Sequence, residues 1–465
     1  MESFRRHQRC RVLLLAVVVL GGCARYEARP LDADVVHADW LAIDPTTAAS
    51  AVTAAWPGDD GADGFELADG INLAEAEALA LFFNPELRVL RLRRGGPEAA
   101  AEHAMLWEDP ELGIDGSYIL ADVDEPLLFG AGLSLTIPLS GRRGARRALA
   151  QAEGDQLAAE IIGAEWAVLT QVREQWAAFT ALRAQDALFA AAMTEIDELL
   201  KLVPQLRDAG LFTSLDEGML RLQRARVVEA QAAAHADAGQ LSLVLVRLLG
   251  LHPAHEWLFT PSRAELTALL AVPADIGIDA QLAEHPQVER ALASYAVSER
   301  QLALEVRKQY PDLTLGLGAG SEDGDARVHF AFGLLPIPFW NSNQLGIATA
   351  EVDRAVAGAE LASAVQAVVQ AHHAAQHAAQ AEAERVKRLR NDLAPLVDQQ
   401  LAEARRLVAL GQADALRVTE ALTQARELRA ELLAAEYAEL AARLRVLATR
   451  GPQAAPLAIA SREEP

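Results

Sequence analysis

Two uninterrupted helical runs of unusual length constrain this fold more than any other feature. The first extends from Ala145 to Ala209 and the second from Asn343 to Leu410. Apolar residues in the first run recur at steps of three and four, a spacing typical of a coiled-coil seam. About 65 residues at a rise of 1.5 Å form a rod of roughly 100 Å, which no compact globular domain needs. Pro204 and Pro395 fall inside the runs and predict a kink in each.

The sequence repeats itself at a distance of about 200 residues. Asn84-Pro85 corresponds to His285-Pro286, at an offset of 285 − 84 = 201, and Gly210 corresponds to Gly411 at the same offset. Each copy has the order helix, two strands, long helix and returning helix. This self-similarity predicts a duplicated unit. The copies occupy residues 71–265 and 272–450, and a tail of residues 451–465 follows.

Four short stretches alternate with a period of two residues. We expect strands at 113–120 and 130–139 in the first copy and at 312–321 and 328–337 in the second. In the third stretch, leucines alternate with Gly316, Gly318 and Gly320. A dinucleotide loop would need G-x-G-x-x-G at the start of a helix, whereas acidic turn residues follow here. The stretch is therefore interpreted as a strand with one apolar and one small-residue face.

Alternation of this kind over about ten residues is typical of membrane β-barrels, whose small residues face the lumen. Gly316, Gly318 and Gly320 would then line a pore. An ordinary sheet packed against helices is the alternative. Four strands cannot close a membrane barrel, because the smallest have about eight and open edges in lipid leave backbone groups unpaired. We therefore expect three chains to share 3 × 4 = 12 strands above a tube of long helices.

The N-terminus carries the features of a lipoprotein signal. A basic region precedes an apolar run, Val12–Leu20, which is shorter than the ~20 residues of a spanning helix. Leu20-Gly21-Gly22-Cys23 follows it. We expect residues 1–22 to be a signal peptide, Cys23 to carry acyl chains such as palmitate, and residues 23–70 to form a lipid-anchored segment. The alternative is an ordinary secretory signal with a chance cysteine.

Charge and motifs exclude several classes of function. The net charge of −23 gives no electrostatic support to nucleic-acid binding. No serine elbow, Walker loop or paired-carboxylate spacing appears, so we expect neither an enzyme nor a cofactor. His373 and His377 stand four residues apart on one helix face and are weak candidates for metal ligands, with a solvated face as the alternative. The basic run Arg142–Arg147 could meet lipid phosphates or simply begin a solvated helix.

These features together resemble the TolC-type outer-membrane efflux factors. The resemblance covers about residues 70–450 and rests on the segment before Cys23, on "IPLSGRRGARRALAQAE" (Ile137–Glu153) and on "LPIPFWNSNQLGIATAEVD" (Leu335–Asp353). The two internal motifs are most similar to those of the cobalt–zinc–cadmium branch. The resemblance implies a mainly α chain with a transmembrane β portion. It also implies a homotrimer with a 12-stranded outer-membrane barrel and a periplasmic α-helical tunnel.

The function implied by the resemblance is passive conduction without catalysis. Such a channel exports heavy-metal cations or small toxic compounds to the exterior. It works with a periplasmic adaptor protein and, indirectly, with an inner-membrane resistance–nodulation–division pump. The outer-membrane component of a type I protein secretion system shares the fold and stays open as an alternative. An adaptor or a purely coiled-coil lipoprotein is disfavoured, because each copy contains a strand pair.

The resemblance also implies roles for residues at the helix turns. The adaptor would dock at two tips, which are formed by Ala209, Gly210, Leu211, Leu410 and Gly411. At the second tip Gln412 replaces the expected apolar residue. Asp216 and Glu420, which follow the tips, are candidates for a tunnel gate, with plain solvated charges as the alternative.

Overall fold

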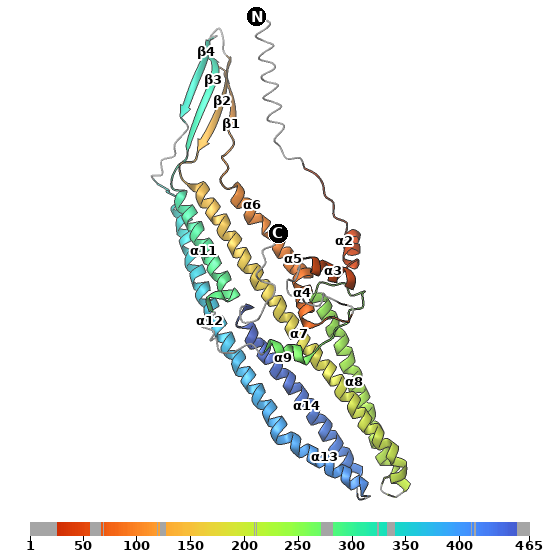
Figure 1. The fold of residues 1–465 in the computed structure, drawn as a ribbon. Coiled ribbons are helices and arrows are strands. Elements are labelled where there is room, and N and C mark those ends of the chain that lie inside the picture. The colour runs from red at the N-terminus through yellow and green to blue at the C-terminus, as the bar shows by residue number, and fades with distance from the viewer. Residues whose placement is uncertain are drawn as a thin grey trace.

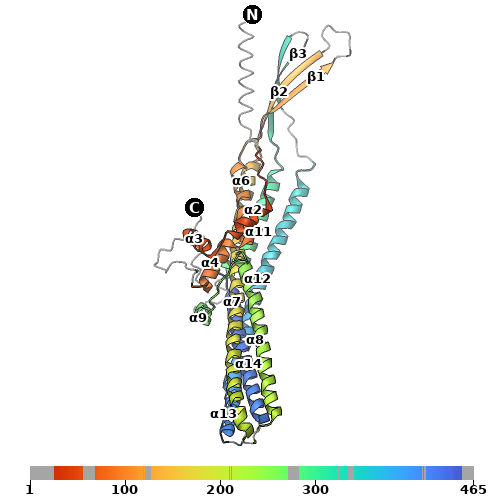
Figure 2. The ribbon, with the colours of Figure 1, turned by 90° about the vertical axis from the view of Figure 1, so that its right-hand side faces the viewer.

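The protein is elongated, with a slender sheet at one end of a long helical stalk (Figures 1 and 2). The computed structural model describes residues 26–55, 67, 69–118, 120, 127–208, 210, 212–270, 282–322, 325–332, 340–410, 412 and 415–452. The predicted signal segment and Cys23 lie outside these residues. Within the described residues, no helix combines the length and the apolar character that crossing a membrane requires.

The four predicted strands form one antiparallel sheet in the order β1-β2-β3-β4. Their bounds are β1 Glu111–Tyr118, β2 Leu127–Ile137, β3 Leu313–Glu322 and β4 Asp325–Phe332. Residues 333–337 of the predicted fourth strand lie outside the described residues. The central pair, β2 with β3, joins residues that are 176 to 192 positions apart in the chain, from Ile137↔Leu313 to Phe129↔Ser321. The prediction of a mainly helical chain with a β portion is confirmed.

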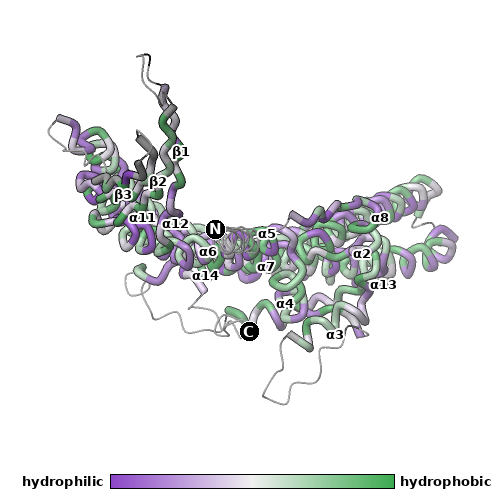
Figure 3. The backbone as a smooth tube through the Cα atoms, turned by 90° about the horizontal axis from the view of Figure 1, so that it is seen from above, coloured by the Kyte–Doolittle hydropathy of each residue, from purple (hydrophilic) through white to green (hydrophobic). Residues whose placement is uncertain are grey.

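The long helices form two antiparallel hairpins that run away from the sheet (Figure 1). The first hairpin consists of α7 (Arg142–Asp208) and α8 (Ser214–Leu248), and the second of α12 (Gln344–Arg388), the π-helical turn η2 (Leu389–Leu393), α13 (Ala394–Ala409) and α14 (Ala415–Ala448). The 67 residues of α7 continue through Pro204 without a break. In the second hairpin the irregular turn ends two residues before Pro395, whose ring and missing N–H disturb the preceding hydrogen bonds. Polar and apolar residues intermingle along both hairpins (Figure 3).

The main hydrophobic core lies beside the middle of α7, where shorter helices pack against it. Trp176 of α7 is fully buried among Leu79 of α4 (Leu73–Phe83), Leu245 of α8 and Leu266 of α9 (Arg263–Leu269). The predicted seam of α7 faces this core and smaller clusters nearer the tip. Its buried members are Trp166, Leu169, Val172, Trp176, Phe179, Phe189, Ile196 and Val203. Each fully buried side chain of this size stabilises the fold by about 1.5–3 kcal/mol.

The matching Asn-Pro and His-Pro pairs of the two copies both begin helices. The Asn84 side chain accepts hydrogen bonds from the N–H groups of Glu86 and Leu87 at the start of α5 (Pro85–Arg93). His285 Nδ1 accepts from the N–H of Gln287 at the start of α11 (Pro286–Arg307). Proline is suited to the first helical position because its N–H would be unpaired there anyway. Within the residues that the structure describes, the remaining short helices are α2 (Ala33–Leu41), α3 (Pro45–Ala55), α6 (Gly95–His103) and η1 (Leu282–Glu284).

Candidate functional site

One face of the sheet is apolar and uncovered. Directly paired residues of an antiparallel sheet share a face, so the register defines each face row by row. One row consists of Leu112, Leu133, Leu317 and Phe330, which are 69%, 52%, 53% and 78% exposed. The next row consists of Ile114, Ala131, Ala319 and Val328. A sheet packed against helices would bury these side chains, so the exposure contradicts that alternative.

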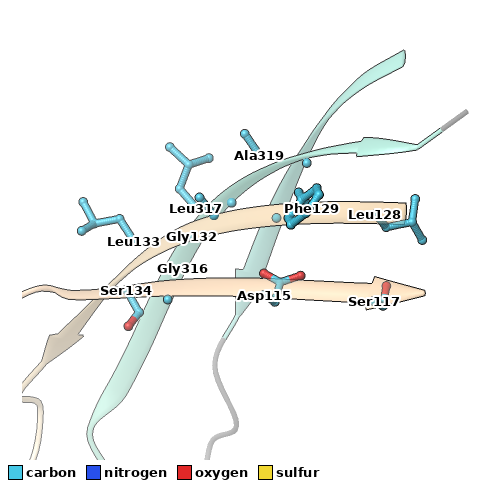
Figure 4. Close-up of a pocket in the computed structure, with 15 residues that line it drawn as sticks. Asp115, Ser117, Leu128, Phe129, Gly132, Leu133, Ser134, Gly316, Leu317 and Ala319 are labelled. Atoms are coloured by element: carbon cyan, nitrogen blue, oxygen red, sulfur yellow. The ribbon is translucent and has the colours of Figure 1, made fainter. Parts of the chain in front are cut away.

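The opposite face carries small and polar residues. Gly132 pairs with Gly318, Gly130 with Gly320 and Ser134 with Gly316, which gives a nearly bare surface. The predicted pore-lining residues Gly316, Gly318 and Gly320 all belong to this face. Figure 4 shows Leu133 and Leu317 projecting from one side of the sheet and Ser134 from the other. The strands curve around a shallow hollow of about 450 Å³.

Two successive cross-strand pairs combine a glycine with a side chain that lies over it. On the small-residue face, a Cβ atom at Gly130 would lie 2.6 Å from the carboxylate oxygens of Asp115. On the apolar face, a Cβ atom at Gly116 would lie 3.7 Å from the ring of Phe129. Asp115 therefore rests flat across β2, and only glycine leaves it that room.

A hydrogen-bonded junction joins the end of α11, which precedes the second strand pair, to the start of α12, which follows it. Asn343, at φ +52°, uses its Nδ2 to donate to the backbone oxygen of Glu305 at 2.9 Å and to Oε2 of Glu305 at 2.8 Å. Lys308 Nζ lies 2.6 Å from the other carboxylate oxygen, and these hydrogen bonds, first from Lys308 and then from Asn343, lower the pKa of Glu305. A Cβ at Gly346 would lie 2.6 Å from Glu305 Oε2. The N-x-N-Q-x-G motif, Asn341–Gly346 within the quoted segment Leu335–Asp353, is therefore a structural joint.

The equivalent junction of the first copy uses the start of the basic run. Arg142 donates to the backbone oxygen of Tyr310 at 3.0 Å and lies 3.6 Å from the carboxylate of Asp312. Arg143 donates to the backbone oxygen of Met105 and stacks over the ring of Trp107 at 4.9 Å. Arg142 therefore holds the start of α7 against the segment that leads into β3, and Arg143 holds it against the segment that follows α6. Arg146 and Arg147 are exposed, and their contact with lipid phosphates remains a prediction.

Both helix turns lie at the end of the molecule opposite the sheet (Figure 1). Gly210 has φ +71°, and its N–H donates to the backbone oxygen of Arg207 at 2.9 Å, which closes the end of α7. The buried ring of Phe212 then packs with Val203 and Leu220. In the second turn, Leu410 is 58% exposed. Of the other predicted tip residues, Ala209, Leu211 and Gly411 lie outside the described residues.

Comparison with known proteins agrees with this geometry. No family model matches the sequence. The cobalt-zinc-cadmium resistance protein CzcC of Cupriavidus metallidurans is 24% identical over 215 residues, which cover 46% of this chain and only about half (51%) of that relative. The solved structure of CusC superposes with a TM-score of 0.70 at 17% identity, covering 82% of this chain and 92% of CusC. The chain has the fold of the TolC-type outer-membrane channels.

Further solved structures with the TolC-type fold support this assignment. VceC of Vibrio cholerae gives a TM-score of 0.64 at 17% identity over 82% of this chain and 96% of VceC. The outer-membrane channel OprN gives a TM-score of 0.66 at 16% identity over 82% of this chain and 89% of OprN. The resemblance to TolC-type proteins and the expected fold class are thereby confirmed. These structures are described as channels or outer-membrane proteins rather than enzymes, in agreement with the prediction of no enzyme.

The two gate candidates have different local environments near the tips of this fold. Asp216 closes a capping box at the start of α8: its Oδ2 accepts from the N–H and the hydroxyl of Thr213, each at 2.7 Å. Glu420 on α14 is exposed and is 3.5 Å from the amide of Gln424. Asp216 thus stabilises the start of α8. Gating by either residue remains a prediction.

The weak metal candidates His373 and His377 are both exposed on α12. Across the part of the chain that the structure describes, no three histidine, cysteine or acidic side chains are placed to hold a metal ion. Their neighbour His372, which the sequence did not single out, is buried instead. Its Nδ1 lies 2.9 Å from the hydroxyl of Thr449 at the end of α14. The histidine-rich stretch therefore contributes a packing contact between α12 and the end of α14.

Sequence reasoning also missed a histidine contact that holds α2 on the loop after α8. His252 Nε2 lies 3.3 Å from His37 Nε2, and the Trp40 indole donates to the backbone oxygen of Gly250 at 3.0 Å. His252 Nδ1 accepts from the N–H of Ala254. The proton of the neutral His252 ring is therefore on Nε2, where it is donated to His37, so the pair is a hydrogen bond rather than two metal ligands. The two histidines are 215 positions apart, and no sequence signal connects them.

Proposed function

We propose that this protein is the outer-membrane channel of a tripartite efflux system. The observation that carries the proposal is the open four-stranded sheet with an exposed apolar face and a small-residue face. Such a sheet is suited to lipid on one side and to a water-filled lumen on the other. The channel is a passive conduit, and an inner-membrane resistance–nodulation–division pump supplies the energy.

Closure of the barrel requires further copies of the chain. β1 and β4 are the edges of the described sheet, and an edge in lipid leaves backbone N–H and C=O groups without partners. Each unpaired group costs several kcal/mol in hydrocarbon. A homotrimer removes all edges by pairing β4 of one copy with β1 of the next, which gives 3 × 4 = 12 strands. The same three copies bring their helical hairpins together as a tunnel in the periplasm.

The helical tips are the proposed contact with a periplasmic adaptor. The adaptor-docking residues are Ala209, Gly210, Leu211, Leu410 and Gly411. Asp216 and Glu420 are proposed to face the mouth of the tunnel, where copies related by a three-fold axis repel one another. Acylation of Cys23 would add a lipid anchor to the barrel.

Heavy-metal cations or small toxic compounds are the proposed cargo. Two features support metals: the similarity of the junction motifs to the cobalt–zinc–cadmium branch, and the similarity of the chain to CzcC, a cobalt-zinc-cadmium resistance protein. Export of a protein by a type I secretion system is the alternative, because it uses the same fold.

Deletion of the gene in its host tests this function. Growth is measured at increasing concentrations of cobalt, zinc and cadmium and of hydrophobic toxic compounds. The secreted proteins of the same cultures are identified in parallel. We expect the deletion to lower tolerance to metals or toxic compounds, and a plasmid copy to restore it. Unchanged tolerance together with the loss of one secreted protein would overturn efflux in favour of protein secretion.

A further inference from the structure

The small-residue face carries one carboxylate in the middle of a strand. Asp115 is the fifth residue of β1, whereas the other described acid of β1 on this face, Glu111, begins the strand. The register continues from Asp115 through Gly130 and Gly320 to Arg327 on β4. The row therefore has an acidic residue at one edge of the sheet, a basic residue at the other and two glycines between them.

The glycine beneath Asp115 fixes where its charge lies. Any side chain at Gly130 would collide with the carboxylate, since a Cβ there would be 2.6 Å from both of its oxygens. Gly132, two residues along the same face, has no such neighbour: its nearest atoms would be 3.7 Å away. The bare position at Gly130 thus lets the Asp115 carboxylate lie along the wall, over that glycine.

Charges on the wall of a narrow water-filled lumen act strongly on passing ions. Low-dielectric walls focus the field of fixed charges into the water and change the local concentration of ions of each sign. Rings of carboxylates favour cations and rings of basic residues favour anions. Three copies of the sheet would place three Asp115 carboxylates and three Arg327 guanidinium groups on the lumen wall.

We propose that Asp115 and Arg327 set the ion preference of the channel lumen in opposite directions. Asp115 attracts cations into the barrel, and Arg327 limits that attraction. This inference rests on the proposed function, because it requires the small-residue face to line a closed lumen. It adds that the conduit is selective by charge within the barrel itself, independently of any gate at the helical tips.

The test is the reversal potential of the purified channel in a planar lipid bilayer under a KCl gradient. The dilute side is kept at about 0.01 M, where the Debye length is about 30 Å and wall charges are weakly screened. Four proteins are compared: wild type, Asp115→Asn, Arg327→Gln and the matched control Ser117→Ala. Ser117 lies on the same face of β1, two residues beyond Asp115, and carries no charge.

We expect Asp115→Asn to lower the potassium-to-chloride permeability ratio by roughly twofold or more, and Arg327→Gln to raise it. Ser117→Ala should match the wild type. A conducting channel whose ratio is the same in all four proteins would overturn the inference and leave the channel function intact. Absence of conductance in the wild type would overturn both. If one charge variant does not assemble, the direction in which the other variant changes the permeability ratio still supports or overturns the inference.

Discussion

Arg173 forms a two-pronged ion pair with Glu77 inside the core. Its Nε lies 2.6 Å from Oε1 and its Nη2 lies 3.2 Å from Oε2. The side chains are only 4% and 14% exposed, and the guanidinium also lies over the ring of Trp166 at 5.4 Å. This pair fastens α4 to the long helix α7 where the two helical hairpins and the short helices meet.

Removal of one partner should leave the other charge buried and uncompensated. We expect Glu77→Ala to lower the free energy of unfolding by about 3–5 kcal/mol, as measured by denaturant titration followed by tryptophan fluorescence. Arg94→Ala is the matched control, because its pair with Glu98 is about 60% exposed on both sides and should contribute little. Equal losses in the two variants would contradict the structural role of the buried pair.

Docking of α2 should depend on pH. Burial lowers the pKa of His252 below 6.5, and the neighbouring His37 and His255 rings lower it further. The folded contact therefore uses a neutral His252, so its stability is fully present above 6.5 and is lost as the pH falls below that value. Protonation of His252 would add a proton at Nδ1, where it would oppose the Ala254 N–H that Nδ1 now accepts.

Hydrogen exchange of the amides in Ala33–Leu41 measures this effect. We expect faster exchange at about pH 5 than at about pH 8, after correction for the intrinsic rate, because the titration of histidine lies between these values. His37→Ala should exchange rapidly at both pH values, whereas His103→Ala, on α6, should behave as wild type. Equal protection of α2 at both pH values in the wild type would show that the histidine contact does not hold it.

The junction at Gly346 should not tolerate a side chain. An added Cβ would meet Glu305 Oε2 at 2.6 Å and Asn343 Oδ1 at 2.7 Å, within the hydrogen-bonded joint between the end of α11 and the start of α12. Gly346→Ala should therefore lower the thermal midpoint of unfolding clearly. Gly144→Ala, in the first turn of α7 with no atom within 4 Å of its Cβ, should leave the midpoint unchanged or raise it. A Gly346→Ala protein as stable as wild type would refute the packed joint.

A substitution at Gly210 should leave folding intact but prevent docking of the adaptor. Gly210 has φ +71° and open space around a Cβ, so Gly210→Asp adds modest backbone strain and no clash. We expect an inserted protein that no longer cross-links to its adaptor, because the new charge enters an apolar contact. Gly218→Asp, on α8, is the control and should still cross-link. A Gly210→Asp protein that cross-links at the wild-type level would contradict docking at this tip.

The regular parts of this fold were predictable because their periods are visible in the sequence. The seam around Trp176 follows a three-and-four spacing, and the glycines of β3 alternate with leucines, so burial and strand faces could both be inferred. The carboxylate of Asp115 could not be placed over Gly130, since that depends on the register between two strands. The capping role of Asp216 could have been predicted from the sequence but was missed, because Thr213 stands three residues before it, at capping-box spacing.

Whether the open sheet from β1 to β4 is one third of a shared barrel is decided by the number of chains in the assembly. Native mass spectrometry of the protein purified in a non-denaturing detergent measures the number of chains per particle. We predict one dominant species of three chains that resists dilution. A protein that remains a monomer under these conditions would contradict it, because four strands with two open edges cannot close a barrel in lipid.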